Sequence, residues 1–300
     1  MRTIFHVSDV HFGPPHLPRV SEGVLELIED RRPDVVVISG DLTQRARPEQ
    51  FQAARHWVDR IPVPTVVVPG NHDVPLYRVI ERVTGPHRLF REYIHEDLDP
   101  VLRLPDVVIV GLDSTAPWTA LTNGRIVPSQ LEHCERVLAA VEPGVARIVA
   151  AHHHFAPAPD YLHDRTVPKA KRAMRRFIEL GVDMVLGGHL HRAFIGNSLD
   201  FFPGPERDRG VIIVQSGTTT SRRGRGRERE KNSFNVIAIG RRTLRVTHHM
   251  FFDDHGGFSP VSSHAFPRAG LSGHERTEAL AVPAPADRAL ARGSVSPARS

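Results

Sequence analysis

The chain has 300 residues, a formal net charge of +5 and a single cysteine, Cys134. This length suits one large domain or two small ones, while one cysteine excludes an intramolecular disulfide and a zinc site built on cysteines. The N-terminal apolar run is too short for a secretory signal and no run reaches the roughly 18 residues of a membrane span, so we expect a cytoplasmic protein.

The first 190 residues alternate between apolar runs and amphipathic segments. Runs rich in valine and isoleucine, without polar alternation, predict buried strands at 3–8, 34–39, 65–69, 106–112, 146–151 and 183–188. Helical spacing predicts helices at 20–31, 48–59, 128–141 and 168–180, three of which have a proline near the first turn. This order predicts an α/β fold around a largely parallel sheet.

The pattern changes after residue 190. Strands with short connections are expected at 192–196, 210–217, 233–240 and 244–252, which implies an antiparallel or mixed part. From about Asp253 the chain consists mainly of proline, alanine, serine, glycine and arginine without periodicity. We therefore expect a folded domain over 1–252 and a disordered tail over 253–300.

Arginines are concentrated in the tail and in the stretch SRRGRGREREK, residues 221–231. This stretch contains no aromatic residue of the kind that single-strand binders interleave with basic ones, so nucleic acid is not the expected partner. We expect a loop between two strands of a second sheet. Its composition alone favours a solvated tip.

Acidic, amide and imidazole side chains follow five of the expected strands, at the point where each strand ends. In chain order they are Asp9 and His11; Asp41; Asn71, His72 and Asp73; His152, His153 and His154; and His189 and His191. Ligands of open α/β sheets bind at the carboxyl ends of strands, so we expect these side chains to meet at one edge. Oxygen and nitrogen ligands without thiolate favour manganese, iron, zinc or cobalt over calcium.

A pair of metal ions, roughly 3.5–4 Å apart, needs a shared ligand. Asp41 is the natural bridge because it is the one acidic group in its motif. Gly40, Gly70, Gly187 and Gly188 permit tight turns and close approach of the backbone at this place.

The motifs D-x-H, G-D, G-N-H-D, H and G-H-x-H, in this order from Asp9 to His191, resemble those of the calcineurin-like metallophosphoesterase family. The resemblance implies a two-sheet αββα sandwich with mixed sheets flanked by helices, and makes residues 1–252 its catalytic domain. It also implies two divalent metal ions (Mn²⁺, Fe²⁺/Fe³⁺ or Zn²⁺), the first held by Asp9, His11 and His191, the second by Asn71, His152 and His189, with Asp41 shared. A shift of one residue, to His153, stays open for the ligand His152.

Within the family, GNHDVP, HHHFAP and SGTTTSRRGRG look most like the class III cyclic nucleotide phosphodiesterases and their glycerophosphodiesterase relatives. His72 departs from the arginine of the lipid A pathway pyrophosphatases. The stretch GDLTQRA lacks the G-D-x-x-D-R-G motif of the protein serine/threonine phosphatases.

The resemblance implies hydrolysis of a small phosphodiester, most similar to 3′,5′-cyclic nucleotides such as cAMP, by a metal-bridging hydroxide. His72 would be the general acid and, with Asn71, Arg222 and Arg223, would contact the substrate. The alternatives are a hydrolase of glycerophosphodiesters or other phosphoesters, a DNA nuclease and a non-enzymatic binder. Relatives of this type also suggest a homodimer.

Overall fold

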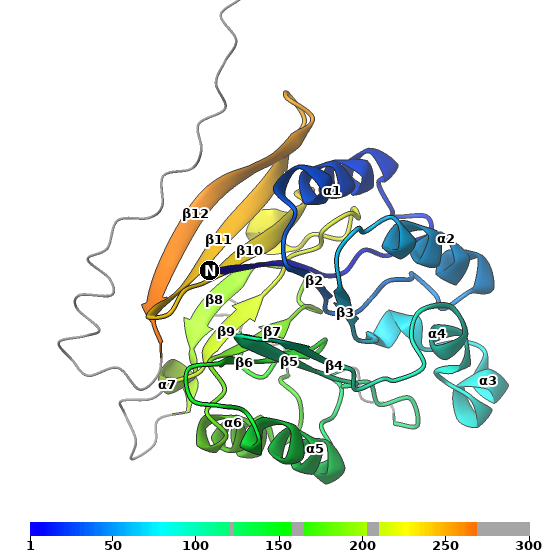
Figure 1. Cartoon of the computed structure of the whole chain (residues 1–300). Coiled ribbons are helices and arrows are strands. Elements are labelled where there is room, and N and C mark those ends of the chain that lie inside the picture. The colour runs from blue at the N-terminus through cyan, green and yellow to red at the C-terminus, as the bar shows by residue number, and fades with distance from the viewer. Residues whose placement is uncertain (120–122, 158–164, 203–209, 269–300) are drawn as a thin grey trace, which may run out of the picture.

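The computed structural model describes residues 1–119, 123–157, 165–202 and 210–268, in which two six-stranded mixed sheets pack face to face between layers of helices (Figure 1). The first sheet has the order β12–β11–β10–β1–β2–β3, with β1 (Arg2–Val7), β2 (Val35–Ile38), β3 (Thr65–Val67), β10 (Ser233–Ile239), β11 (Thr243–Phe252) and β12 (Gly257–Pro267). The second has the order β4–β5–β6–β7–β9–β8, with β4 (Val101–Leu104), β5 (Val107–Leu112), β6 (Ala146–Ala151), β7 (Met184–Gly187), β8 (Phe194–Asn197) and β9 (Ile212–Gln215).

The helices lie outside the two sheets. They are α1 (Pro18–Arg31), α2 (Pro48–Asp59), α3 (Val79–Thr84), α4 (Arg88–Tyr93), α5 (Pro128–Ala139), α6 (Ala170–Glu179) and α7 (Ser198–Phe201), with short 3₁₀ turns at Asn71–Asp73 and Gly226–Glu228. Among the described residues, no helix is long and apolar enough to cross a membrane.

The strands are apolar on both faces because each sheet is covered on both sides. Along β1, Ile4 faces the other sheet, in one cluster with Ile109 and Ile148, whereas Phe5 packs outward in the cluster that contains Trp57 of α2. A third cluster joins the second sheet to α5 and α6. This three-layer burial explains the continuous valine and isoleucine runs, and the αββα sandwich expected from the sequence is confirmed.

Two expectations on the later part of the chain are wrong. The chain does not leave the fold at residue 253, because β12 pairs antiparallel with β11 and extends the first sheet to residue 267. Its serine-rich sequence shows no apolar alternation because no residue of this edge strand is fully buried and its middle, residues 260–264, is solvent-exposed. The rest of the expected tail, 269–300, lies outside the described residues. The arginine-rich stretch 221–231 joins β9 of the second sheet to β10 of the first, and does not connect two strands of one sheet.

Candidate metal centre

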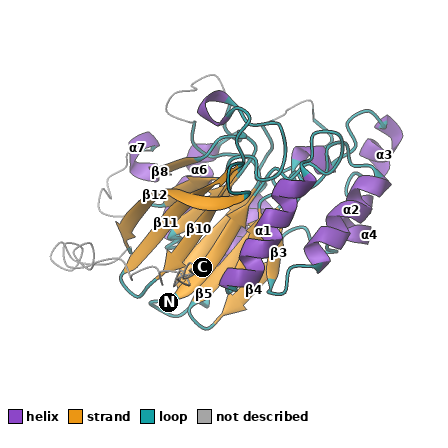
Figure 2. Ribbon diagram, turned by 90° about the horizontal axis from the view of Figure 1, so that it is seen from above, coloured by secondary structure: helices purple, strands orange, loops and turns teal. Residues whose placement is uncertain are grey.

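The expected site residues come from the carboxyl ends of strands in both sheets. β1, β2 and β3 run parallel in the first sheet, and β6 and β7 run parallel in the second. The loops that follow the strands gather beyond one end of the sandwich (Figure 2). The site is therefore built between two sheets and not along the edge of one sheet.

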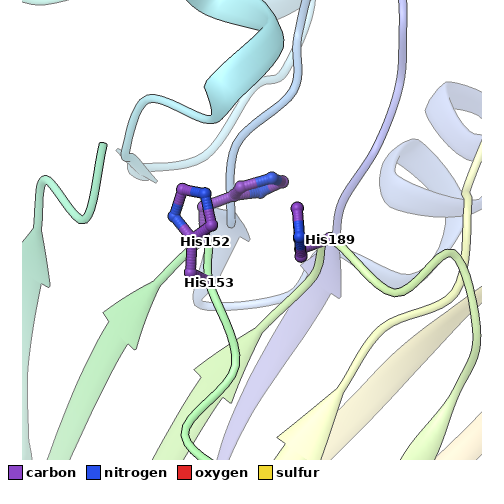
Figure 3. A group of neighbouring side chains, drawn as sticks. All are labelled: His152, His153 and His189. Carbon is purple, nitrogen blue, oxygen red and sulfur yellow. The ribbon is translucent and has the colours of Figure 1, made fainter. Parts of the chain in front are cut away.

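Two groups of side chains could each hold a metal ion, because the ligand atoms within each group all lie within 4.8 Å of one another. One consists of Asp9, His11, Asp41 and His191, and the other of His152, His153 and His189. Figure 3 shows the three rings of the second group converging just beyond the strand ends. Asn71 joins this group, because its Oδ1 lies 3.1 Å from Nε2 of His152 and 2.9 Å from Nδ1 of His189.

Asp41 lies between the two groups. Its Oδ1 is 3.4 Å from Nε2 of His152, and its Oδ2 is 3.7 Å from Nε2 of His11. One carboxylate therefore faces both groups, as the predicted bridging role requires. All seven residues predicted as ligands are brought together, while their binding of metal stays a prediction.

In the first group, the hydrogen-bond acceptor atoms of different side chains face one another. His11 and His191 each direct Nδ1 at a backbone carbonyl, of Thr43 and Arg223, at 3.4 and 2.8 Å. The Nδ1 atoms must donate, so both Nε2 atoms carry lone pairs, yet they lie 3.2 Å apart. Nε2 of His191 also lies 3.1 Å from Oδ1 of Asp9. A cation relieves such an arrangement, so the residues fit a metal ion.

The carboxylates support the same conclusion. Oδ1 of Asp9 and Oδ2 of Asp41 are buried and make no hydrogen bond within the described residues. Although burial lowers it, the Asp41 carboxylate raises the pKa of His152 to about 9. The site thus attracts positive charge, which a divalent cation would supply in place of a proton.

Five of the predicted ligands have left-handed backbone conformations. The φ angles are 54° at Asp9, 55° at His11, 53° at Asp41, 72° at His189 and 53° at His191. Such angles are uncommon outside glycine and typically cost about 1–3 kcal/mol each. The surrounding packing must hold these residues in position, and strain of this kind is concentrated at functional sites.

Asp73 fastens the loops that carry Asp41 and Asn71. Its carboxylate accepts hydrogen bonds from the backbone N–H groups of Leu42, Thr43 and Gly70 at 2.8–3.1 Å. Burial, with the Asp41 charge nearby, raises the pKa of Asp73 to about 7. The sequence placed Asp73 in the G-N-H-D motif but gave it no role. This orienting role could not be predicted from the sequence, because it depends on contacts between two separate loops.

His72 lies at the rim of the centre and is held by two partners. Its Nδ1 donates to the carbonyl of Gln44 at 2.8 Å, and its Nε2 lies 3.2 Å from Nη1 of Arg223. Because the guanidinium can only donate, Nε2 is an acceptor here. A general acid needs a proton on that nitrogen, so the predicted acid role of His72 requires Arg223 to release it.

The structure distinguishes Arg223 from Arg222. Arg223 is half-buried and also donates to Oε1 of Gln44 at 3.0 Å, whereas Arg222 is exposed. Both line an open cavity of about 690 Å³, together with Arg45 and Arg47. Of these two arginines, Arg223 contacts His72 at the rim of the centre, and substrate binding by either arginine stays a prediction.

A family model described as calcineurin-like phosphoesterase matches residues 2–193. A probable cyclic nucleotide phosphodiesterase from Synechococcus is 29% identical over 219 residues, which are 67% of this chain and 78% of that protein. A glycerophosphodiester phosphodiesterase from Enterobacter lignolyticus is 28% identical over 200 residues, 52% of this chain and 72% of that protein.

A dimetal phosphatase from Danio rerio has a similar fold, with a TM-score of 0.59 and 12% identity. The similarity covers 89% of this chain and 99% of that one. At this identity, the comparison supports the two-sheet fold only.

Proposed function

Because the chain belongs to the calcineurin-like phosphoesterase family, we propose that it hydrolyses small phosphodiesters at a centre of two divalent metal ions, with 3′,5′-cyclic nucleotides such as cAMP as its substrates. The observation that carries the proposal is the position of Asp41 between two groups of nitrogen and oxygen ligands. In the proposed enzyme Asp9, His11 and His191 hold one ion, Asn71, His152 and His189 hold the other, and Asp41 holds both.

When bound, two such cations would neutralise charge developing on the phosphoryl group and lower the pKa of a water nucleophile. Manganese or iron suits the imidazole-rich ligand set better than magnesium does. Asn71 contributes a neutral oxygen, which limits the negative charge that an anionic diester meets.

The arginine-lined cavity gives the diester a route to the centre. Arg45, Arg47, Arg222 and Arg223 surround it, and positive charge in a recess attracts an anion. Arg223 contacts His72 at the rim of the centre and can offer a charge-assisted hydrogen bond to a phosphoryl oxygen. When its guanidinium turns to the phosphate, Nε2 of His72 is free to take up a proton from solvent and to donate it to the leaving alkoxide as the P–O bond breaks.

The proposal is tested by metal removal and reconstitution. The protein is stripped with a chelator, loaded with single metals, and assayed for hydrolysis of bis(p-nitrophenyl) phosphate. Activity should vanish on stripping and return with Mn²⁺ or Fe²⁺. A stripped protein that remains fully active would contradict the proposal.

Glycerophosphodiesters are the second substrate class, because one of the reported relatives carries that name. The loaded enzyme should be compared on cAMP, a glycerophosphodiester and single-stranded DNA. A higher kcat/KM for cAMP supports the cyclic nucleotide proposal. Preference for DNA would identify a nuclease, and hydrolysis of none of them would favour a binder. We place the enzyme in the cytoplasm, and the suggested homodimer stays a prediction.

A further inference from the structure

His152 and His153 are neighbours in the chain, and both are buried beside the second group of ligands. Their rings lie edge to face, with centroids 4.9 Å apart. The sequence left open which of the two is the metal ligand. Their hydrogen bonds distinguish them.

His152 has its lone pair on Nε2. Its Nδ1 lies 2.8 Å from the backbone carbonyl of Ser39, which can only accept, so Nδ1 carries the proton. The free Nε2 faces Asn71 and Asp41, the other oxygen donors of the second group. This is the arrangement of a metal-binding histidine, whose distal N–H is held by a backbone carbonyl.

His153 has the opposite pattern. The hydroxyl oxygen of Ser114 accepts the backbone N–H of His153 at 3.1 Å and lies 2.8 Å from its Nδ1. Among the described residues, Nδ1 is the one acceptor that this hydroxyl hydrogen meets. We infer that this buried hydroxyl donates to Nδ1, in which case the neutral ring of His153 carries its proton on Nε2.

The ring of His153 is confined by its surroundings. Gly124 has a φ of 68°, and a Cβ there would overlap the Cγ and Nδ1 of His153 and the carbonyl of Ser114. That carbonyl is held in turn by the N–H of Arg125 at 2.8 Å. The backbone at Gly124 therefore packs directly against the ring of His153 and leaves no room for a larger residue.

Nε2 of His153 is buried and has no hydrogen-bond partner in the described part of the protein, so a proton on it has no acceptor there. A buried donor without a partner is destabilising, which makes a ligand the expected acceptor. His153 also lines a pocket of about 220 Å³ that Asn71 and His72 border. The acceptor is therefore expected where the substrate's phosphate would lie.

We propose that His153 is not a metal ligand but a substrate-binding donor, which offers Nε2–H to a phosphoryl oxygen of the diester. This inference rests on the proposed phosphodiesterase function. It adds a neutral hydrogen-bond donor on the side of the second metal position, whereas Arg223 is a charged donor.

The tautomers can be read directly by nitrogen NMR. The protein is labelled with ¹⁵N-histidine and loaded with Zn²⁺, which is diamagnetic, and His153→Gln assigns the signals. We expect His153 to show a protonated Nε2 and an unprotonated Nδ1, while His152 shows a protonated Nδ1 and a zinc-bound Nε2. Zinc bound to Nε2 of His153 would overturn the inference.

A second experiment measures binding of inorganic phosphate to the zinc-loaded protein by calorimetry. His153→Ala should keep the zinc content of the wild type and raise the phosphate dissociation constant roughly 10- to 100-fold, the loss expected for a hydrogen bond to a charged group. His153→Gln, which keeps an N–H near the Nε2 position, should recover part of the affinity. His152→Ala is the matched control and should lose zinc.

Wild-type phosphate affinity in His153→Ala, or loss of zinc equal to that of His152→Ala, would contradict the inference. Neither measurement needs diester turnover. If the wild type binds phosphate but hydrolyses no diester, the proposed function fails while the role of His153 is still decided.

Discussion

Replacing Asp41 by asparagine tests the bridge through stability. Because Asp41 faces both ligand groups, Asp41→Asn would remove a carboxylate ligand from both ions of the proposed centre, whereas Asp9→Asn would affect one. Metal binding stabilises the folded state by RT ln(1 + [M]/Kd). Asp41→Asn should therefore lose more of the metal-induced stabilisation than a variant that changes a ligand of one ion only.

The size of the effect follows from the number of sites. Even changes in the partners of metal ligands cost about 10- to 100-fold in affinity, or roughly 1.4–2.7 kcal/mol per site at saturating metal. Two sites give about 3–5 kcal/mol. A domain of this size shifts its Tm by about 2–4 °C per kcal/mol, so the metal-induced rise in Tm should shrink by roughly 6–20 °C.

The assay is thermal unfolding with excess Mn²⁺ and with chelator, for wild type, Asp41→Asn, Asp9→Asn and Asn71→Ala. The loss in Asp41→Asn should approach the sum of the losses in the other two. Asp183→Asn is a control, because this buried carboxylate pairs with Arg268 away from the centre and should lower Tm equally with and without metal. A loss in Asp41→Asn no larger than that in Asp9→Asn would refute the bridge.

Four further outcomes are expected. Reconstitution with Mn²⁺ or Fe²⁺ should give higher diesterase activity than Mg²⁺, and full activity with Mg²⁺ alone would contradict the imidazole-rich ligand set. His72→Ala should keep its metal and lose about 10²–10⁴-fold in rate on cAMP. The loss should be smaller on a nitrophenyl diester, because its leaving group needs little protonation. Equal losses on both substrates would limit the role of His72 to holding Arg223. Arg223→Gln should raise KM for cAMP and flatten its salt dependence, whereas Arg222→Gln should change both less; equal effects would contradict the contact to the rim. Gly70→Ala should lose metal as Asp41→Asn does, because a Cβ at Gly70 would overlap the Asp41 carboxylate, and a normal metal content would refute this.

Most strands of the first 190 residues were predictable because burial on both faces leaves a strong sequence signal. Four helices were predicted from their spacing, whereas the short helices α3 and α4 were missed. The short strand β4 was missed, since its four residues are only partly buried and alternate weakly. The strand β12 was mistaken for a tail for a similar reason. It lies at the edge of its sheet, and its exposed serines carry no apolar pattern.

The candidate ligands were predictable because each follows an apolar strand in a recognisable motif. Their partners were not. Ser114, which contacts Nδ1 of His153, is 39 residues away in the chain, and Arg223 contacts His72 across 151 residues. Such contacts depend on how two sheets bring their loops together, which local patterns do not encode.

The central claim is that Asp41 joins two metal ions. It is tested most directly by anomalous scattering from crystals of the manganese-loaded protein. We predict two peaks, both bound by Asp41, one also bound by Asp9, His11 and His191 and the other by Asn71, His152 and His189. A single peak, or two peaks that do not share Asp41, would contradict the account.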